Sequence, residues 1–382
     1  MSALKCRLDD LSKLSAEESN SVLEDFRSRW QELESKSIPD FFLSWQWMAS
    51  WLNSLPFKPI CLTVFDDAEK PIAMGVFMSG TELRHKALKV KQLHLNTTGN
   101  VDHDIITIEY NTLLCERGYE KKAWKAVIGF LTKQKSIPWQ ELIIAGATND
   151  TQEIITPLAH TVYRRAEAGS AFVDLKALRE SGAVNADHYI KTLGKNTRSQ
   201  IRRSIKLYSG HGPITLEHAK TIDEAEEFLD ELSVHHNKKW QARGRKGALE
   251  NPFYQKFHKN LISQCLPTGN VEIIRVRAGD YKFGWLYNFI YGDKVYFYLS
   301  GFRSEEDNRY KAGLVTHAMA IEYHLQNGQE IYDFMGGDNR YKRNLGQPGP
   351  EIVSFAIQKK SIALMAENKL RSAKKLLVKQ QD

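Results

Sequence analysis

The sequence is poor in cysteine, with four in 382 residues, and it contains no CxxC pair. Disulfide scaffolds and cysteine zinc sites need closely spaced cysteines, so this pattern argues against both and favours a reducing compartment. No apolar run approaches the roughly 18 residues of a membrane helix. The opening segment, MSALKCRLDDLSKLS, has no apolar core and is not typical of a signal peptide. We therefore expect a cytoplasmic protein.

Sequence signatures of several enzyme classes are also missing. There is no GxxxxGK, no GxGxxG, no HExxH and no GxSxG. These absences disfavour P-loop nucleotide hydrolysis, a standard dinucleotide-binding fold, zincin chemistry and an α/β-hydrolase nucleophile. We expect no metal.

Positive charge is in modest excess, with a formal net charge of +7. This balance suits an anionic partner: a nucleotide cofactor, a phosphorylated sugar, RNA or a lipid surface. It does not choose among them, and an ordinary solvated basic surface explains it equally well.

The first half of the chain reads as helices, then strands, then a helix and further strands. Amphipathic helices are predicted over 15–33 and 41–55, the first opened by a capping box of Ser15 and Glu18. Four strand-like runs follow, PICLTVF, PIAMGVFM, LKVKQLHL and DIITI. A helix over 119–134 leads to two more, ELIIAG and AFVDL.

The second half repeats this order. Its expected helices cover 196–208, 223–240 and 253–266. Three strands follow, VEIIRVRAG, YKFGWLYNFIYG and KVYFYLSGF, with Gly-Asp turns typical of hairpins. A helix over 311–326 then joins the last of them to EIYDF, and IVSFAIQ is a further strand. A helix between two extended segments favours a parallel crossover.

The repeated order predicts mixed α/β sheets in two tandem domains. We expect the first domain at 1–180, the second, catalytic domain at 181–358, and a basic helical tail at 359–382. The tail carries a loose apolar stripe. We expect it to pack on its own domain, with peripheral contact to an anionic membrane as the alternative.

Four basic residues recur at helical spacing in the segment KNTRSQIRRSIK: Lys195, Arg198, Arg202 and Lys206. Steps of three and four residues place them on one helix face. Such a face can hold phosphates, although a solvated face explains each residue equally well.

His236 and Trp240 lie one turn apart in HHNKKWQARG and share a helix face. A histidine there can titrate near neutral pH and serve as a base or a hydrogen-bond donor. A purely structural role is the usual alternative for a helical histidine beside a tryptophan.

The most specific segment is DFMGGDNRYKRNLG, over 333–346. A strand ends at Asp333 and enters a glycine turn, after which come Asp338, Tyr341 and Lys342. Glycines let the backbone approach a ligand closely, and a lysine here can stabilise an oxyanion. Loops after parallel strands are favoured ligand sites. A tight turn with a surface salt bridge is the alternative.

In their order along the chain, six segments resemble GNAT-like acetyltransferases of cellulose and exopolysaccharide biosynthesis, the CelD type. The segments are NTRSQIRRS, HHNKKWQARG, YFYLSGF, KAGLVTHAMAIEYHLQNG, YDFMGGD and YKRNLG. The set is similar, more distantly, to Fem-type peptidoglycan aminoacyltransferases, which have two GNAT-like domains. The resemblance covers about 41–354 and is strongest over 196–346. It implies tandem GNAT folds, an intracellular location and acyl transfer to an amine or hydroxyl.

The resemblance also implies roles for the matching residues. His236 and Trp240 occupy the family's HxxxW element, Tyr341 and Lys342 its YK element, and Asp333 the acid that ends its strand. We expect Lys342, Asp333, His236 and Tyr341 to be catalytic, with Lys342 at the oxyanion and Asp333 or His236 as base. The expected substrate-binding residues are Trp240, Arg243, Arg198, Arg202, Tyr298 and Asp338.

One segment departs from the family's pattern. GNAT enzymes hold the pyrophosphate of CoA on a turn patterned Q/R-x-x-G-x-G/A, whereas this chain reads RYKAGL over 309–314. We expect backbone amides at that helix start, with Arg309, Lys311 and Gly313, to bind acetyl-CoA or another acyl-CoA. The departure leaves aminoacyl-tRNA open as the donor.

The leading expectation is thus acyl-CoA-dependent N- or O-acetylation of a small or sugar-linked acceptor in cell-envelope polysaccharide biosynthesis. The first alternative is a Fem-type transferase that uses tRNA. The second is a non-catalytic module that binds sugar nucleotides or proteins. We expect no contact with DNA.

Overall fold

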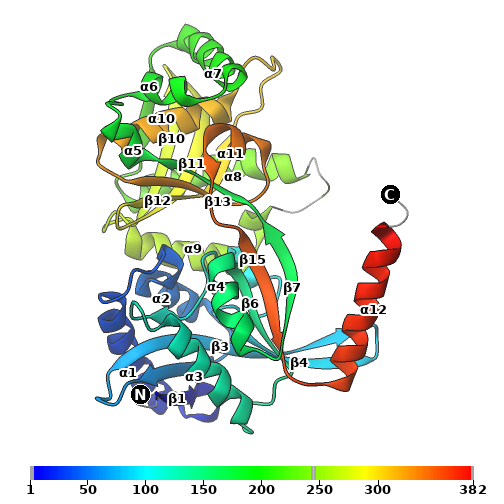
Figure 1. Cartoon of the computed structure of the whole chain (residues 1–382). Coiled ribbons are helices and arrows are strands. Elements are labelled where there is room, and N and C mark those ends of the chain that lie inside the picture. Colours follow the sequence, from blue (N-terminus) through cyan, green and yellow to red (C-terminus); the bar gives the residue numbers. More distant parts are fainter. Residues whose placement is uncertain (1–3, 242–243, 245–246, 380–382) are drawn as a thin grey trace. The chain divides into compact units, whose positions relative to one another are not determined.

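The protein is described here by a computed structural model that covers residues 4–241, 244 and 247–379. The chain forms two compact units (Figure 1). Unit 1 contains the residues up to Met48, Leu55–Glu167 and the residues from Ile352 on. Unit 2 contains Ala49–Ser54 and Ala168–Glu351.

Unit 1 is built on a mixed sheet with the order β1-β2-β3-β4-β6-β15-β7, and β5 pairs with β3. Its strands are β1 (Lys5–Asp10), β2 (Ile60–Phe65), β3 (Pro71–Arg84), β4 (Leu88–Leu95), β5 (Leu114–Cys115), β6 (Glu141–Thr148), β7 (Thr161–Ala168) and β15 (Ile352–Gln358). Its helices are α1 (Ala16–Glu34), α3 (Glu120–Lys133), α4 (Asn149–Ile155) and α12 (Ile362–Lys379), while α2 (Trp45–Ser54) continues into the segment assigned to unit 2.

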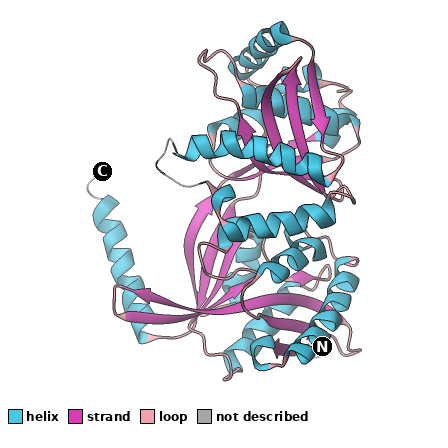
Figure 2. Cartoon of the chain, turned by 180° about the vertical axis from the view of Figure 1, so that it is seen from behind, coloured by secondary structure: helices cyan, strands magenta, loops and turns pink. Residues whose placement is uncertain are grey.

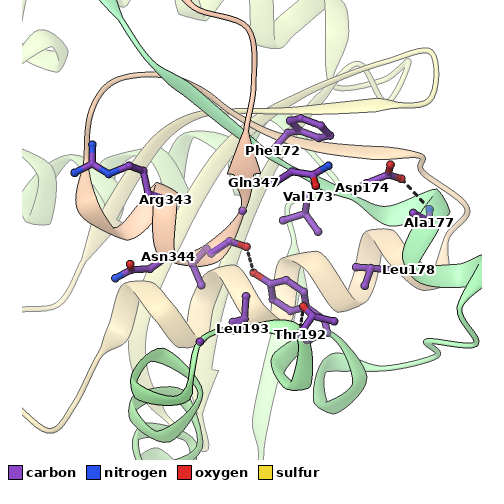
Figure 3. A pocket seen from close by; sticks show the side chains of 14 residues that line it. Phe172, Val173, Asp174, Ala177, Leu178, Thr192, Leu193, Arg343, Asn344 and Gln347 are labelled. Carbon is purple, nitrogen blue, oxygen red and sulfur yellow. Dashed lines mark hydrogen bonds between the residues drawn. The ribbon is translucent and has the colours of Figure 1, made fainter.

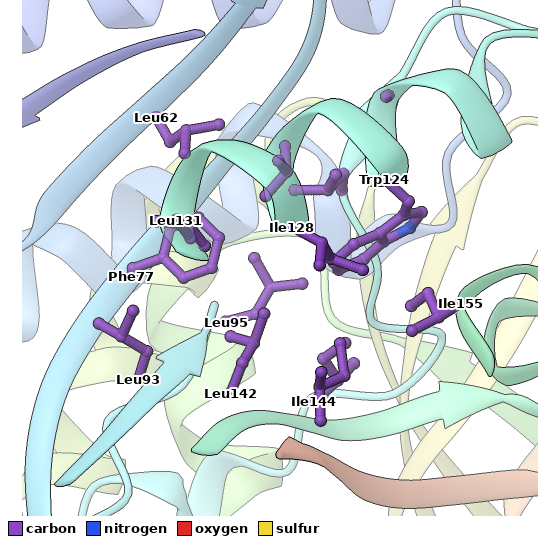
Figure 4. Close-up of a cluster of buried hydrophobic side chains, with 14 of the residues drawn as sticks. Leu62, Phe77, Leu93, Leu95, Trp124, Ile128, Leu131, Leu142, Ile144 and Ile155 are labelled. Atoms are coloured by element: carbon purple, nitrogen blue, oxygen red, sulfur yellow. The ribbon is translucent and has the colours of Figure 1, made fainter. Parts of the chain in front are cut away.

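Two helices of unit 1 follow directly from sequence patterns. α1 begins with the expected capping box, in which the Ser15 and Glu18 side chains each accept from the other's backbone amide. α3 buries an apolar face that includes Trp124, Val127 and Leu131, and this face packs in the same core as sheet residues (Figure 4). Fully burying one such aliphatic side chain stabilises a fold by about 1.5–3 kcal/mol.

Unit 2 contains the second sheet, with the order β14-β8-β13-β12-β11-β10-β9. Its strands are β8 (Ser170–Asp174), β9 (Ile214–His218), β10 (Val271–Ala278), β11 (Tyr281–Tyr291), β12 (Lys294–Phe302), β13 (Ile331–Gly336) and β14 (Gln347–Pro348). Its helices are α5 (Leu175–Glu180), α6 (Ala186–Thr192), α7 (Lys195–Tyr208), α8 (Ile222–Gln241), α9 (Pro252–Cys265), α10 (Ala312–Gln326) and α11 (Arg340–Leu345).

Helices cover both faces of the second sheet (Figure 2). Successive side chains of β11 show the two faces, because neighbours along a strand point to opposite sides. Trp285 donates from Nε1 to Glu231 of α8 at 2.8 Å, whereas Leu286 lies in the core cluster that contains Ile321 of α10. The hairpins β10–β11 and β11–β12 turn at the predicted Gly-Asp pairs, where Gly279 and Gly292 both have φ of +57°.

Two strands belong to the other unit's sheet than their position in the sequence suggested. β8, the segment expected in the first domain, pairs with β13 of unit 2, and β15, expected in the second, pairs with β6 of unit 1. The chain therefore crosses between the units at 167/168 and 351/352. Alternation of apolar residues predicts a strand but does not choose its partner, which is set by contacts distant in sequence.

The segment DIITI, predicted as a strand, is not one. Asp104–Ile106 forms a 3-10 turn instead. The Asp104 carboxylate accepts from the Thr98 amide and the Gly99 amide, both at 2.7 Å, and this local pairing holds the loop. Such side-chain to backbone bonds compete with strand formation.

Candidate active site

A split between two parallel strands organises the candidate site. β12 and β13 pair in parallel over three residues each, Lys294–Tyr296 with Ile331–Asp333. β12 continues to Phe302 and β13 to Gly336 beyond this short ladder. The strands therefore part at Phe297 and Phe334. A split of this kind leaves main-chain groups of both strands able to bond a ligand.

His317, on α10, lies where the strands part. Its ring centroid is 4.6 Å from that of Phe297 on β12 and 5.1 Å from that of Phe334 on β13. The ring also stacks on Tyr341 of α11, with centroids 5.7 Å apart and planes 18° apart. Burial and, to a smaller extent, the charge of Lys342 lower the pKa of His317 to about 3, so its imidazole is neutral at physiological pH.

Lys342 and the preceding glycine turn fold onto one another. The Lys342 side chain is buried, and its Nζ donates to the carbonyl oxygens of Gly336 at 2.6 Å and Met335 at 3.4 Å. Gly337 has φ of +124°, and a Cβ there would lie 3.3 Å from the Lys342 amine. A side chain at 337 would thus be strained and would crowd the ammonium group.

The Asp333 carboxylate is buried, and each of its two oxygens has a polar partner. One carboxylate oxygen forms a 2.9 Å ion pair with Lys294, and the other accepts from the Met335 amide at 2.7 Å. Burial of a carboxylate is tolerated when it is paired and hydrogen-bonded in this way. The same bond accompanies the left-handed conformation of Met335, whose φ is +60°. Tyr341 and Lys342 lie on α11, just after the end of β13. Asp333 does not end its strand as predicted, because β13 continues to Gly336, and its ion pair is with Lys294 of β12.

The expected cofactor residues lie where α10 begins. The Lys311 amide donates to Ser204 Oγ of α7 at 2.7 Å, so the start of α10 lies beside the basic helix α7. Arg309 pairs with Asp307 at 2.7 Å. A Cβ at Gly313 would lie 3.0 Å from the Phe302 ring, which gives this glycine a packing role between α10 and β12. The side chain of Lys311, the N-cap residue of α10, makes no capping hydrogen bond.

The basic residues of α7 are partly engaged within unit 2. Arg202 pairs with Asp187 at 2.7 Å, and Arg198 donates to the Lys191 carbonyl at 3.1 Å. Hydrogen bonds from Lys191 and Arg202 lower the pKa of Asp187 to about 2. The buried residues of α7 are Thr197, Ile201, Ser204 and Tyr208.

His236 and Trp240 lie on α8, which packs on β12. Their rings are 6.1 Å apart, and His236 Nδ1 lies 3.1 Å from the Ser300 carbonyl oxygen. A carbonyl oxygen only accepts, so Nδ1 carries the proton and the lone pair of the neutral ring is on Nε2. His236 thus has the tautomer that a general base at Nε2 requires.

Three predicted residues remain, Tyr298, Asp338 and Arg243. Tyr298 lies in an aromatic cluster, where its hydroxyl is 3.2 Å from His258 Nε2. Asp338 is exposed, 3.7 Å from Arg343. Arg243 lies outside the described residues.

A pocket of about 500 Å³ opens beside α11 (Figure 3). Its lining includes Arg343, which follows Lys342 in the chain, together with Phe172, Thr192, Asn344 and Gln347. The Tyr189 hydroxyl donates to the Leu345 carbonyl at 2.7 Å and ties α6 to α11 at this pocket. The lining offers amides, a hydroxyl and a guanidinium, which are groups that recognise polar ligands.

Sequence reasoning missed His317, Lys294 and Tyr332. His317 lies on the buried side of α10, and a histidine within a largely apolar helical stretch was the available signal. Lys294 begins a strand, and nothing in its spacing links it to Asp333. Its role depends on the parallel pairing of β12 with β13.

No group of three or more His, Cys, Asp or Glu in the described part of the chain is arranged to hold a metal ion. No described helix is both long and apolar enough to cross a bilayer.

Comparison with known proteins supports this architecture. Residues 195–343 match the family model described as an acetyltransferase (GNAT) domain. The match runs from α7 into α11 and includes the whole strand split. No curated protein matches the sequence.

Solved structures are similar over nearly the whole chain. FemX has 12% identity and a TM-score of 0.58, and the match covers 88% of this chain and 96% of FemX. L-PGS from Bacillus licheniformis has 10% identity, coverage of 88% and 94%, and a TM-score of 0.52. The C-terminal domain (DUF2156) of a putative lysylphosphatidylglycerol synthetase from Agrobacterium fabrum has 11% identity, coverage of 90% and 94%, and a TM-score of 0.51.

The fold and the family match together define an acyltransferase. Its two units are tandem GNAT-like domains, each with antiparallel strands, a crossover helix and a parallel strand. The match to the acetyltransferase (GNAT) domain model lies within unit 2.

Proposed function

We propose that the protein transfers an acyl group from an acyl-CoA to an amine or hydroxyl at the β12–β13 split. The observation that carries this proposal is the convergence of Lys342, Tyr341 and His317 where these strands part. The start of α10, where the N-cap side chain makes no capping bond, supports a donor that carries phosphates, because helix N-termini attract anions.

The proposed reaction is direct transfer. His236 Nε2 takes the proton of the acceptor amine or hydroxyl as the acceptor attacks the acyl carbonyl carbon. A carbon–nitrogen or carbon–oxygen bond forms, the carbon–sulfur bond breaks, and the thiolate leaves while it accepts a hydrogen bond from the Tyr341 hydroxyl. The thiolate then takes up a proton from solvent, to which His236 returns the proton of the acceptor. Lys342 steadies the negative charge on the carbonyl oxygen. Asp333 is the second candidate base, although it is already paired with Lys294.

Tyr341 suits the role of hydrogen-bond donor to the leaving thiolate. Burial raises the pKa of its phenol well above the usual value, so the hydroxyl stays protonated and can donate this bond. Its ring is held in place by the stack on His317.

We propose that the acceptor is sugar-linked, in cell-envelope or exopolysaccharide synthesis of the CelD type. The pocket beside α11 is the proposed place for it, with Asn344, Gln347 and Arg343 available to polar groups. Trp240, Tyr298, Asp338, Arg198 and Arg202 remain the proposed further contacts with the substrates.

The deciding experiment is native mass spectrometry of the purified protein against a panel of acyl-CoAs and UDP-sugars, followed by calorimetry with CoA. We expect a one-to-one complex with at least one acyl-CoA. The absence of any CoA binding to the wild-type protein would refute the acyl-CoA donor.

One observation favours aminoacyl-tRNA as a second candidate donor. Gly313 is accounted for by its contact with Phe302, and Arg309 is paired with Asp307, so the start of α10 is less open to a pyrophosphate than the usual glycine turn. The basic surface of α7 would then bind RNA. Binding of aminoacyl-tRNA that weakens steeply with salt, together with no binding of CoA, would select this donor.

A further inference from the structure

His317 is completely buried, and one of its ring nitrogens has no partner. Its Nδ1 lies 3.1 Å from the Tyr332 hydroxyl, whereas Nε2 is buried without a hydrogen-bond partner in the described chain. Buried polar atoms are nearly always bonded in native proteins, and an unbonded one calls for an explanation. A buried donor or acceptor without a hydrogen bond lowers the stability of the fold by more than a typical hydrogen bond raises it.

The hydrogen bond to Tyr332 fixes where the proton of His317 resides. Tyr332 is fully buried, and burial raises the pKa of its phenol well above the usual value, so it stays protonated. Its hydroxyl needs an acceptor, and among the described residues its hydrogen bond is to His317 Nδ1. Nδ1 therefore accepts, and in a neutral imidazole the proton is then on Nε2.

The position of this N–H matters because of the strand split. The His317 ring contacts Phe297 and Phe334, the first residues of β12 and β13 beyond their short ladder, and it stacks on Tyr341. A neutral N–H placed there can donate to a carbonyl oxygen without the cost of burying a charge. It adds to the Lys342 ammonium a second donor on another element of unit 2.

We propose that His317 Nε2–H donates a hydrogen bond to the carbonyl oxygen of the acyl group being transferred, and so helps to bind and polarise it. This inference rests on the proposed acyl transfer at the split. It is independent of whether the acyl group arrives as a thioester of CoA or an ester of tRNA, because both present the same carbonyl.

Two amide substitutions separate this role from a structural one. In His317→Asn the side-chain oxygen replaces Nδ1 and accepts from Tyr332, but nothing replaces Nε2. In His317→Gln the longer amide returns an N–H near the Nε2 position, while Tyr332 loses its acceptor. We expect Asn to keep the melting temperature and lower turnover about a hundredfold, the usual cost of losing one such donor.

For His317→Gln we expect the opposite pattern: a lower melting temperature, and turnover within about tenfold of wild type. The measurements are melting temperature, kcat and KM on the same samples. If turnover follows melting temperature in both variants, His317 is only structural and the proposal is wrong. Tyr332→Phe is the matched control, because it removes the hydroxyl that selects the tautomer and leaves the imidazole in place.

The position of the proton on the His317 ring can be measured without an activity assay. In protein labelled with ¹⁵N-histidine, two-bond proton–nitrogen spectra distinguish the two neutral tautomers. We expect His317 to show a protonated Nε2 and a bare Nδ1 from pH 7 down to pH 5. A protonated Nδ1 in the free protein overturns the proposal, whatever the donor proves to be.

The two proposals fail in different ways. If no acyl donor binds or reacts with the wild-type protein, the proposed function fails, while the spectra still decide the tautomer of His317. If wild type is active and His317→Asn matches it in kcat and KM, the function stands and the role of His317 is refuted.

Discussion

In both units a crossover helix joins two parallel strands that pair over three residues and then part. In unit 1 the paired residues are Gln92–His94 of β4 and Glu141–Ile143 of β6. In unit 2 they are Lys294–Tyr296 and Ile331–Asp333. What lies beyond the pairing differs between the units: unit 1 fills its split with its own side chains, whereas the split in unit 2 is the proposed ligand site.

Unit 1 closes its split with its own chain. The buried Asn111 side chain donates to the Leu95 carbonyl of β4 at 2.9 Å and to the Ala145 carbonyl of β6 at 3.0 Å, so it bridges the two strands. Asn96 in turn donates to the Asn111 oxygen at 3.0 Å. This network satisfies the main-chain groups that parted strands leave unpaired.

The crossover helices of the two units, α3 and α10, differ in the polarity of their buried residues. The buried residues of α3 are all apolar, whereas those of α10 include Thr316, His317 and His324. A helix that only packs needs no buried imidazole, because each buried polar group must be matched by a partner. The comparison therefore supports the proposal that the reaction takes place in unit 2.

The largest effect expected from this comparison is at Lys342. Lys342→Met should lower turnover about a hundredfold or more, since it removes a donor to the developing oxyanion, and substrate binding should change less. Lys342→Arg should rescue only in part, because a planar guanidinium places its charge differently.

Lys342 also bonds two carbonyls, so its structural contribution must be measured on the same sample. Melting temperature and single-turnover rate together separate the two roles. A lowered melting temperature with a normal rate would end the catalytic assignment.

A variant at Asn111 tests the split of unit 1 in the way that Lys342 tests the split of unit 2. Asn111→Ala should lower the free energy of unfolding by about 2–3 kcal/mol, because it leaves buried carbonyls without donors. Turnover at a temperature where the variant is folded should be unchanged. Denaturant unfolding and the standard activity assay test this, and a selective loss of activity would show that the unit 1 split also takes part in the reaction.

The third effect concerns pH. The pKa of His317 is lowered to about 3 in the folded protein, so between pH 6.5 and about 3 the unfolded chain binds a proton that the native chain does not. Stability therefore falls as the pH falls through this window, by about 2 kcal/mol from pH 7 to pH 5. His317→Asn should lack this part of the slope in denaturant unfolding at a series of pH values. Equal slopes in both proteins would contradict the assignment.

The smallest effect is expected at the start of α10. Arg309→Ala should weaken CoA binding about tenfold, the scale of one charge-assisted contact. Arg164→Ala is the matched control, because Arg164 is another exposed, ion-paired arginine, but in unit 1. Calorimetry that gives the same affinity for wild type and Arg309→Ala would remove Arg309 from the proposed donor site.

The sequence predicted the limits of helices better than it predicted which segments contact one another. The limits of α7, α8, α9 and α10 agree with the predicted helices to within a residue or two, because apolar periodicity is a local signal. The position of Tyr341 and Lys342 close to the end of β13 was also accessible, since both follow this strand closely in the chain. His317 was not, because its importance comes from strands that part only in three dimensions.

The exchanged strands have a consequence for how the chain is made. β15 must find β6 across about two hundred residues of intervening chain, so the first sheet stays incomplete until the second unit has left the ribosome. Pairings this distant in sequence slow folding and leave an unpaired strand edge exposed meanwhile. A chain that stops before Ile352 would carry that exposed edge of β6 permanently. During synthesis, the unit with the closed split depends for its completion on the unit that carries the site.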